Sequence, residues 1–458
     1  MGEAHERAAQ ALSVAAGERY DAVVIGAGPG GEVVASRLAS AGRRVALAER
    51  ELIGGECAYW ACIPSKTLLR PVDVRAEATR AAGIGTPPRR WPDAAAYRDF
   101  MIRNLDDAKQ LEDYRRDGVA VYKAPARIAA PGRVEVAGAT LLSERIVVAT
   151  GSDAVLPPID GLRRAECWTN REATTLADIP EAAVVLGGGP VGIELGQMLR
   201  RYGARVTIVE SAPRLLARED PAVSELIGEA LADDGIEVLT DARAVAVDGS
   251  RVQLEGGNRL GPARLVVAVG RAPRVEGLGL EAAGVRADEH GIAVDERCRA
   301  AEGVWAVGDV TGVMPFTHVA KYQARIACDD IAGRDVRANY DGVPRVVFSD
   351  PEVAASGRTA GQARAEGRDV ATARIRLPEL LARPWTYERE PRGELELVAD
   401  RTRGVLIGAW AVAPLAAEWI HPAALAIRAA VPLRTLRDFP AQFPTFTEAY
   451  LAAVERLQ

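Results

Sequence analysis

The chain has 458 residues, of which 48% are hydrophobic and 26% charged, with 44 glycines and a formal net charge of -6. This length predicts two or three ordered domains, and charges scattered without a basic stripe exclude nucleic acid as the expected partner. The first 18 residues carry Glu3, Glu6 and Arg7 before a short alanine-rich run, which is typical of neither a secretion signal nor a membrane span. We therefore expect a cytoplasmic enzyme with no membrane segment.

The segment from Tyr20 to Glu49 predicts a strand, a glycine turn, a helix and a second strand. In its GAGPGG turn, Gly26 permits the tight bend, Gly28 lets a pyrophosphate approach the backbone, and Gly31 lets the helix pack close to the strand. Glu49 ends the second strand, where its carboxylate can bond a ribose hydroxyl. The segment therefore predicts a dinucleotide site; the alternative is a glycine turn that only packs a helix on a sheet.

Cys57 and Cys62 lie five positions apart in GGECAYWACIPSK, residues 54 to 66. In a regular helix such residues have Cα atoms about 8 to 9 Å apart, beyond disulfide reach, so a bonded pair needs a distorted turn. Pro64 suits a first helical turn and so places Cys62 at a helix amino terminus, where backbone dipoles and the charge of Lys66 favour a thiolate. We expect a redox pair rather than a metal site or an inert pair. The other cysteines are expected to be buried and inert: Cys167, Cys298 and Cys328.

The strand, turn, helix and strand pattern returns in residues 182 to 210. Its glycine turn supplies Gly187, Gly189 and Gly192. Glu210 ends the second strand, where it would accept bonds from a ribose 2'-hydroxyl and repel a 2'-phosphate. This favours NADH over NADPH, although Arg214 nearby argues the other way. The chain thus contains two copies of one dinucleotide-binding unit.

Two later apolar runs, residues 265 to 273 and 303 to 312, predict buried strands. Both end in glycine turns, one of them containing Gly270, where ligands meet the carboxyl ends of parallel strands. From about residue 340 the pattern changes to extended runs followed by helical stretches, which predicts a third, α+β domain.

These residues resemble the class I flavin disulfide reductases, the pyridine nucleotide-disulfide oxidoreductases that include dihydrolipoamide dehydrogenase, glutathione reductase and mercuric reductase. The resemblance also rests on ATGS at 149 to 152, VGRAP at 269 to 273, AVGDV at 306 to 310, THVA at 317 to 320, DPE at 350 to 352 and PTFTEA at 444 to 449. It implies an α/β fold with two Rossmann-like domains, for FAD and for NAD, and a C-terminal α+β dimerisation domain. The implied domains are residues 1–160 and 280–338 for FAD, 161–279 for the nicotinamide nucleotide and 339–458 for the interface.

The resemblance also assigns site residues. It implies that Cys62 is the thiol next to the flavin and that Cys57 exchanges with substrate. Lys66 would lie near flavin N5, paired with Glu194, and Asp309 would hold the ribityl chain. The implied FAD site further contains Gly55, Thr150, Gly151 and His318. The family also implies a homodimer in which the partner completes each active site.

The closing motif departs from the family. Where the family's disulfide reductases have a histidine that protonates the departing thiolate, this chain has Phe443. Glu448, which would hold that histidine, is expected to be structural here, and Tyr450 is a testable replacement for the base. Losing a positioned acid-base group usually costs about 10² to 10⁴ in rate, so an unstrained disulfide is a poor fit as substrate.

Two further departures concern access to the site. Tyr59 and Trp60 stand where the family commonly has a small polar and glycine-rich spacer; they could stack on a flat substrate or only fill the core. Pro190 stands where some relatives carry a tyrosine that covers the nicotinamide pocket, which implies open access.

We therefore expect an NAD(P)H-dependent FAD enzyme that reduces a small activated acceptor through Cys57, such as an electron-poor disulfide or a thiol-bound species. One alternative is a quinone or dye reductase whose flavin reacts directly, and another is a redox-sensing flavoprotein. Mercury reduction is disfavoured because the chain ends VERLQ without tail cysteines. Dihydrolipoamide oxidation is disfavoured by the missing base.

Overall fold

The computed structural model describes residues 17 to 457; residues 1–16, most of the segment tested for a secretion signal, lie outside them. The chain forms two compact units, each assembled from separated stretches. The first unit contains the described residues up to 64, residues 99–155 and residues 271–339. The second contains residues 65–98, residues 156–270 and the described residues from 340 onward.

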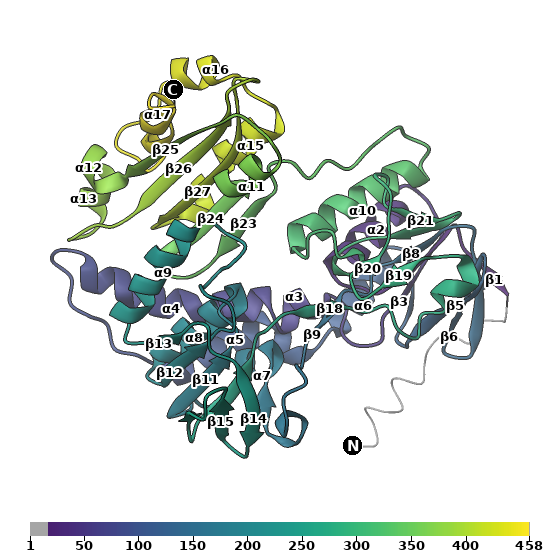
Figure 1. Ribbon diagram of the computed structural model, residues 1–458. Helices are drawn as coiled ribbons and strands as arrows, with labels where there is room; N and C mark the ends of the chain where they lie inside the picture. The colour runs from purple at the N-terminus through teal and green to yellow at the C-terminus, as the bar shows by residue number, and fades with distance from the viewer. Residues whose placement is uncertain (1–16, 458) are drawn as a thin grey trace. The chain divides into compact units, whose positions relative to one another are not determined.

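The first unit is built on a sheet in the order β21-β22-β8-β2-β3-β4, parallel except for the β21–β22 pair. The strands are β2 (Ala22–Ile25), β3 (Val45–Ala48), β4 (Ala120–Tyr122), β8 (Ile146–Val148), β21 (Arg299–Ala301) and β22 (Val304–Ala306). β2, β3, β8 and β22 are buried throughout, as expected of strands covered on both faces. Helices α2 (Pro29–Ser40) and α10 (Thr317–Ile331) pack side by side against it (Figure 1).

Smaller elements complete this unit. A four-stranded sheet contains β1 (Glu18–Arg19), β5 (Ala126–Ala130), β6 (Arg133–Val136) and β7 (Ala139–Leu142). Two-stranded ribbons pair β9 (Ser152–Ala154) with β18 (Arg271–Pro273), and β19 (Ala287–Asp288) with β20 (Gly291–Ile292). The short helices are α3 (Gly55–Tyr59), η1 (Arg103–Leu105), α6 (Ala108–Arg116), η3 (Leu280–Ala283) and η4 (Asp309–Thr311).

The second unit begins with a fully parallel sheet in the order β10-β17-β11-β12-β13. Its strands are β10 (Cys167–Trp168), β11 (Ala182–Leu186), β12 (Arg205–Val209), β13 (Glu237–Leu239) and β17 (Arg264–Val267). A meander of β14 (Ala244–Asp248), β15 (Arg251–Leu254) and β16 (Arg259–Leu260) shares a core with one face of the sheet. The helices of this part are η2 (Leu162–Arg164), α7 (Asn170–Thr174), α8 (Pro190–Tyr202) and α9 (Pro221–Asp233).

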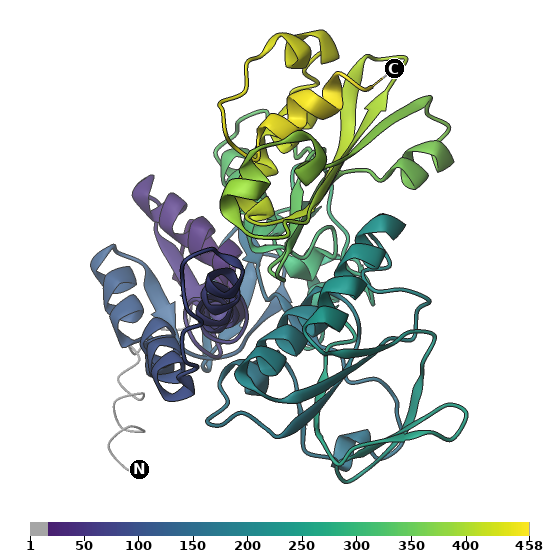
Figure 2. The same ribbon diagram turned by 90° about the vertical axis from the view of Figure 1, so that its left-hand side faces the viewer.

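The same unit contains an antiparallel sheet in the order β23-β24-β27-β26-β25. Its strands are β23 (Pro344–Val347), β24 (Glu352–Gly357), β25 (Val370–Arg376), β26 (Glu394–Asp400) and β27 (Val405–Ala413). Helices α15 (His421–Arg428) and α17 (Glu448–Val454) pack on this sheet (Figure 2). The other helices of this part are α11 (Ala360–Ala365), α12 (Leu377–Leu380), α13 (Arg383–Tyr387), α14 (Ala416–Trp419) and α16 (Leu433–Asp438). The predicted architecture of two α/β sheets, each with a strand, turn, helix and strand unit, and a terminal α+β part is confirmed.

Two helices continue across the boundaries between the stretches. Helix α4 spans Cys62–Arg80, and α5 spans Trp91–Met101. In the second unit, the buried face of α4 packs in one core with α8 and with strands of the antiparallel sheet, through Leu69, Met198 and Val353 among others. This shared core joins residues 65–80 of α4 to the parallel sheet and the antiparallel sheet of the second unit.

Candidate functional site

The first glycine turn has the backbone that a dinucleotide needs. Gly26 has φ +101°, and a Cβ there would lie 2.4 Å from the carbonyl oxygen of Ala149. A Cβ on Gly31 would lie 1.9 Å from the carbonyl oxygen of Gly26, so helix and turn touch. Gly28 is the N-cap of α2, and a Cβ there would meet nothing within 4 Å. Its open side leaves the amino end of α2 accessible to a pyrophosphate.

Glu49 follows β3 at the carboxyl edge of the same sheet and is 9% exposed. Its Oε2 accepts a hydrogen bond from the amide of Ala27 at 2.7 Å, and its Oε1 accepts one from Glu51 at the same distance. Each carboxylate oxygen can accept more than one hydrogen bond, so both keep capacity for a ribose hydroxyl.

Asp309, Thr150 and Gly151 lie on neighbouring turns at the same edge of the sheet. Asp309 begins η4 and accepts a hydrogen bond from the Ser152 hydroxyl at 2.6 Å. The Thr150 hydroxyl donates to the carbonyl oxygen of Arg274 at 2.8 Å, and the Gly151 carbonyl accepts from the Arg274 amide at 2.9 Å. The turns after β2, β8 and β22 thus converge, which brings the sequence-predicted FAD residues of this unit together.

The cysteine loop lies against the first glycine turn. Gly54 and Gly55 have φ +118° and +60°, and a Cβ on Gly55 would lie 2.9 Å from the Cα of Gly28. The helix breaks at Trp60, whose φ of -135° separates α3 from α4. This break is the distorted turn that the cysteine spacing predicts, and Cys62 begins α4.

The two sulfurs share one hydroxyl group. Thr317, the first residue of α10, donates to Cys57 Sγ at 3.2 Å, and its Oγ1 lies 3.4 Å from Cys62 Sγ. The hydrogen bond with Cys62 and burial raise the pKa of Cys57, while the Thr317 hydroxyl and Lys321 act in the opposite direction. The Thr317 hydroxyl thus contacts both sulfurs of the pair.

Sequence reasoning missed Thr317, although it quoted the motif THVA and selected His318. The His318 ring is exposed and stacks on Phe316, with ring centroids 5.3 Å apart. Among the other cysteines, Cys298 and Cys328 are buried as expected, and burial raises the pKa of Cys328 to about 11. Cys167 differs from the expectation, because it is only half-buried.

A second missed group surrounds Glu56, the residue directly before Cys57. Its carboxylate lies 3.3 Å from Arg274 and 3.8 Å from Arg271. Arg271 also donates to the Ser152 hydroxyl at 2.8 Å, and Ser152 donates in turn to Asp309. Two arginines therefore connect the start of the cysteine loop to the residues around Asp309.

The second glycine turn repeats the first. Gly187 has φ +109°, and its Cβ would lie 2.4 Å from the carbonyl oxygen of Ala268. A Cβ on Gly192 would lie 1.9 Å from the carbonyl oxygen of Gly187, while a Cβ on Gly189 would meet nothing within 4 Å. Gly270 likewise faces open space. The residues fit a second dinucleotide at the amino end of α8.

Glu210 takes the place that Glu49 has in the first copy. Its Oε2 accepts from the amide of Gly188 at 2.6 Å and its Oε1 from the amide of Ala212 at 2.7 Å. Arg214 donates to the Ser224 hydroxyl at 2.8 Å and to the carbonyl oxygen of Ala217 at 2.7 Å. The guanidinium of Arg214 is thus occupied by groups of its own unit.

Lys66 and Glu194 form the ion pair that the resemblance implies. Lys66 Nζ lies 2.6 Å from Glu194 Oε2, between α4 and α8. The other Glu194 oxygen accepts from the amide of Phe348 at 2.9 Å, and the Lys66 ammonium lies 4.8 Å from the Phe348 ring centroid. Phe348, which sequence reasoning missed, precedes the quoted motif DPE by two positions.

The closing motif holds no imidazole. Phe443 is 74% exposed. Glu448, the first residue of α17, accepts from the amide of Thr445 at 3.0 Å, which places its carboxylate in a helix-start contact. The Tyr450 hydroxyl donates to the carbonyl oxygen of Trp419 at 2.6 Å, and burial raises the pKa of Tyr450. Neither Glu448 nor Tyr450 is arranged as a general base.

The aromatic residues of the cysteine loop behave differently. Tyr59 is fully buried; its hydroxyl donates to the carbonyl oxygen of Ile53 at 3.1 Å and accepts from Arg103 at 3.3 Å. Tyr59 therefore fills the core, and only the half-buried Trp60 is placed to meet a substrate.

The described residues contain neither a metal-binding cluster nor a membrane-spanning helix. No cluster of three or more histidine, cysteine, aspartate or glutamate side chains in residues 17 to 457 could hold a metal ion. Within the same residues, no helix has the length and apolarity needed to cross a membrane.

Comparisons with known proteins cover nearly the whole chain. Residues 20–324 match the family model "Pyridine nucleotide-disulphide oxidoreductase", and residues 343–454 match the dimerisation domain of the same family. Dihydrolipoyl dehydrogenase of Thermus scotoductus is 34% identical, covering 96% of this chain and 97% of its own. Mercuric reductase of Streptomyces lividans is 32% identical, covering 95% and 96%. The Cu(II) complex of the HOCl-induced flavoprotein disulfide reductase RclA from Escherichia coli superposes with a TM-score of 0.85 at 27% identity, covering 95% of this chain and all of that one.

Proposed function

The chain belongs to the pyridine nucleotide-disulphide oxidoreductase family, and from that premise we propose that it passes electrons from NADH through FAD and the Cys57/Cys62 pair to a small acceptor that needs no proton donor. FAD dependence and a homodimer follow from the family. The acceptor, the preference for NADH and the individual residue roles are the proposal.

Both nucleotide sites fit the groups they would hold. In the first unit, the amino end of α2 would take the FAD pyrophosphate, Glu49 a ribose and Asp309 the ribityl chain. Bound FAD supplies hydride acceptance from a nicotinamide and delivery of an electron pair to a disulfide. In the second unit, Glu210 would take the ribose of NADH, and the nearby cation Arg214 donates to Ser224 and Ala217.

The observation that carries the proposal is that the closing motif has Phe443 and no imidazole, although the Thr317 hydroxyl holds the two cysteine sulfurs together as a pair. The thiolate of Cys57 attacks the acceptor, and Cys62 then attacks Cys57 sulfur and completes the two-electron reduction. Each attack expels a leaving group, and Phe443 offers that group no proton. Acceptors whose leaving groups are stable anions, or ions held by thiolates, therefore suit this site.

The names of the relatives narrow the first acceptors to test. Mercuric reductase is named for a thiol-binding metal ion, and RclA was solved with Cu(II). Thiolates bind copper, and the Cys57/Cys62 dithiolate would deliver two electrons as it closes to a disulfide, one to each of two Cu(II) ions, so that no leaving group would need a proton. Electron-poor aromatic disulfides share this property, because their thiolates leave unprotonated at neutral pH.

The test begins with Cys57→Ser and Cys62→Ser, with Cys167→Ser as the matched control. We expect both loop variants to lose turnover with an electron-poor disulfide and with Cu(II), while Cys167→Ser turns over normally. Anaerobic titration with NADH should give a long-wavelength absorbance band of a thiolate beside oxidised flavin, absent in Cys62→Ser. Full turnover of a quinone by both loop variants, with no such band in the unchanged protein, would instead establish a quinone or dye reductase.

A further inference from the structure

Helices α4 and α8 are joined by two contacts, each between a basic and an acidic side chain, and the two contacts have opposite polarity. Lys66 of α4 meets Glu194 of α8 at 2.6 Å, and Asp73 of α4 meets Arg201 of α8 at 2.9 Å. The two ionic residues are seven positions apart in each helix, close to two turns of 3.6 residues. The Tyr202 hydroxyl adds a third link, donating to the carbonyl oxygen of Leu68 at 3.0 Å. The two helices are therefore held in one axial register.

The segment that carries Phe348 follows the same face of α8. Glu194 accepts from the Phe348 amide at 2.9 Å, and Gln197 accepts from the Asp350 amide at 2.8 Å. Gln197 also donates to the Asp350 carbonyl at 3.0 Å, and Arg201 lies 2.9 Å from the Asp350 carboxylate. Residues 194, 197 and 201 of one helix thus hold both α4 and the segment against which Lys66 packs.

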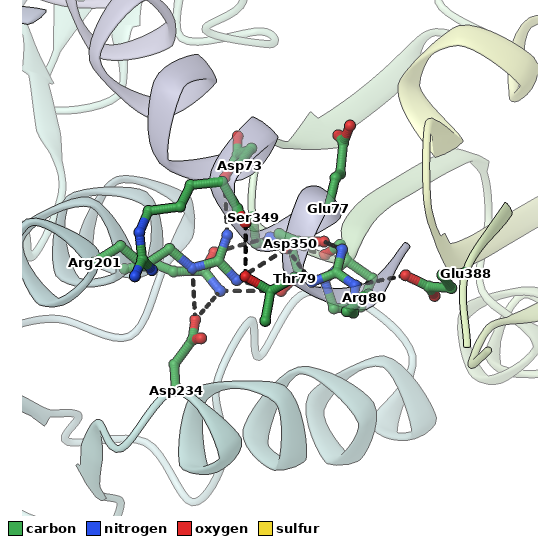
Figure 3. A network of polar contacts seen from close by, with 12 residues as sticks. Asp73, Glu77, Thr79, Arg80, Arg201, Asp234, Ser349, Asp350 and Glu388 are labelled. Atoms are coloured by element: carbon green, nitrogen blue, oxygen red, sulfur yellow. Dashed lines mark hydrogen bonds and ion pairs between the residues drawn. The ribbon is translucent and has the colours of Figure 1, made fainter. Parts of the chain in front are cut away.

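Arg201 lies at the centre of a buried polar cluster (Figure 3). Its side chain is only 10% exposed and contacts the carboxylates of Asp73, Asp234 and Asp350, each at 2.9 Å. Arg80 extends the cluster from Asp350 at 2.8 Å to Glu388 at 2.5 Å. Removing one member of a buried ionic cluster leaves the others without compensation, so Arg201 restrains all the elements that it touches.

We propose that Arg201 is a positioning residue that fixes α4 against α8 and against the Phe348 segment, and so holds the Lys66 ammonium in its pair with Glu194. This inference rests on the proposed role of Lys66 beside the flavin. Arg201 itself lies two turns away from Lys66 along the helix pair and acts through it. A displacement of about 1 Å at a reacting group can cost roughly 10²-fold in rate. Such a displacement is smaller than the rise of a helix over a single residue, so a small shift of α4 along α8 is enough.

The test is a double-mutant cycle between Arg201→Gln and Lys66→Met, read by the rate at which NADH bleaches the FAD-loaded protein. We expect each single variant to slow bleaching by about 10-fold to 10²-fold. If Arg201 acts through Lys66, the double variant is no slower than the slower single variant. Rate losses that multiply would overturn the proposal, because Arg201 would then act independently of Lys66.

A second readout does not depend on activity. The lysines of the chain are Lys66, Lys109, Lys123 and Lys321, so reductive ¹³C-methylation gives few NMR signals, and Lys66→Met assigns the one from Lys66. That signal should move in Arg201→Gln and return toward its original position in Arg201→Lys. An unmoved signal would overturn the proposal. Arg70→Gln, which removes an exposed ion pair to Glu77 on the same helix, is the matched control and should move nothing.

Failure of this inference can be separated from failure of the proposed function. Bleaching by NADH and the lysine signal involve no electron acceptor, so they report on Lys66 even if Cys57→Ser leaves turnover intact. If Arg201→Gln does not fold, Asp73→Ala removes the α4 side of the same contact and completes the same cycle with Lys66→Met.

Discussion

The two glycine turns have the same backbone geometry, but they differ in how closely other residues approach them. A Cβ on Gly30 would lie 3.1 Å from the Val307 side chain, and Gly55 of the cysteine loop lies against Gly28. At the corresponding place in the second turn, Val191 is 40% exposed and Pro190 is also exposed. The same local geometry thus has closer neighbours from its own unit in the first copy than in the second. If the two turns hold FAD and NADH as proposed, we expect FAD to be retained and NADH to exchange.

The largest losses of stability and of nucleotide binding should come from substituting the glycine at which the helix touches the turn, Gly31 in the first copy and Gly192 in the second. Gly31→Ala and Gly192→Ala each place a Cβ 1.9 Å from a carbonyl oxygen, so each should cost about 1–3 kcal/mol or more. We expect Gly31→Ala to lose FAD, measured as flavin absorbance per protein, and Gly192→Ala to keep FAD but react poorly with NADH. The opposite distribution of losses would reverse the assignment of the two turns.

Glu210, the carboxylate at the strand end of the second turn, should contribute to the affinity for NADH and not to the binding of FAD. A hydrogen bond to a charged group contributes about 1.5–3 kcal/mol, so Glu210→Ala should raise the KM for NADH by about 10-fold or more. Its FAD content should not change, and its discrimination against NADPH should shrink. Steady-state kinetics with both nucleotides measure this, and an unchanged NADH to NADPH ratio would contradict the role of Glu210.

The packing around the two turns can be compared at Gly30, directly before Gly31, and at Val191, directly before Gly192. Gly30→Val would press on Val307 and should lower the free energy of unfolding by about 1–3 kcal/mol and weaken FAD retention. Val191→Ala, at the exposed equivalent, should stay within about 0.5 kcal/mol. Thermal denaturation of both variants compares the sites, and equal losses would show that the second turn is enclosed too.

The smallest predicted effect concerns how the two units respond to pH. In the first unit, burial opposes ionisation of Asp330, but hydrogen bonds from Arg299 and Trp305 outweigh it and lower its pKa. In the second unit, burial raises the pKa of Asp73 to about 8; Arg201 lowers it, and Asp350, Glu77 and Glu352 raise it. Asp330 therefore stabilises the fold above its ordinary pKa, and this contribution is lost in acid.

The sign is opposite for Asp73. Its protonated form is favoured in the folded state, so its contribution is complete below its ordinary pKa and is lost as the pH rises through about 8. Asp73→Asn should therefore flatten the loss of stability between about pH 5 and pH 8 by roughly 1 kcal/mol or more. Melting temperatures across this range measure the effect, and an unchanged slope would show that Asp73 is ionised in the folded protein.

Much of the fold was accessible from sequence because glycine spacing and apolar runs are local. The turns at Gly26 and Gly187, their terminal glutamates and the broken helix between the cysteines all follow from residues close in the chain. The pair of Lys66 with Glu194 joins distant residues, and it came only from the family resemblance.

The remaining contacts depend on side chains that meet across the fold. Thr317 reaches the two sulfurs from a helix about 260 positions away. The Glu56 contacts with Arg271 and Arg274 and the Arg201 cluster likewise join separate elements. No periodicity or spacing marks such contacts, because charged residues at those positions are equally typical of a solvated surface.

The contact between Gly55 and Gly28 also has a kinetic consequence. Gly55, the first residue of α3, lies against the turn that would hold the FAD pyrophosphate, so we expect cofactor release to be coupled to opening of the cysteine loop. The residence time of FAD would then be set by a local unfolding event, and hydrogen exchange of residues 54 to 62 would proceed at the pace of FAD loss. The loop that carries the redox pair would thereby also act as the latch that retains the cofactor.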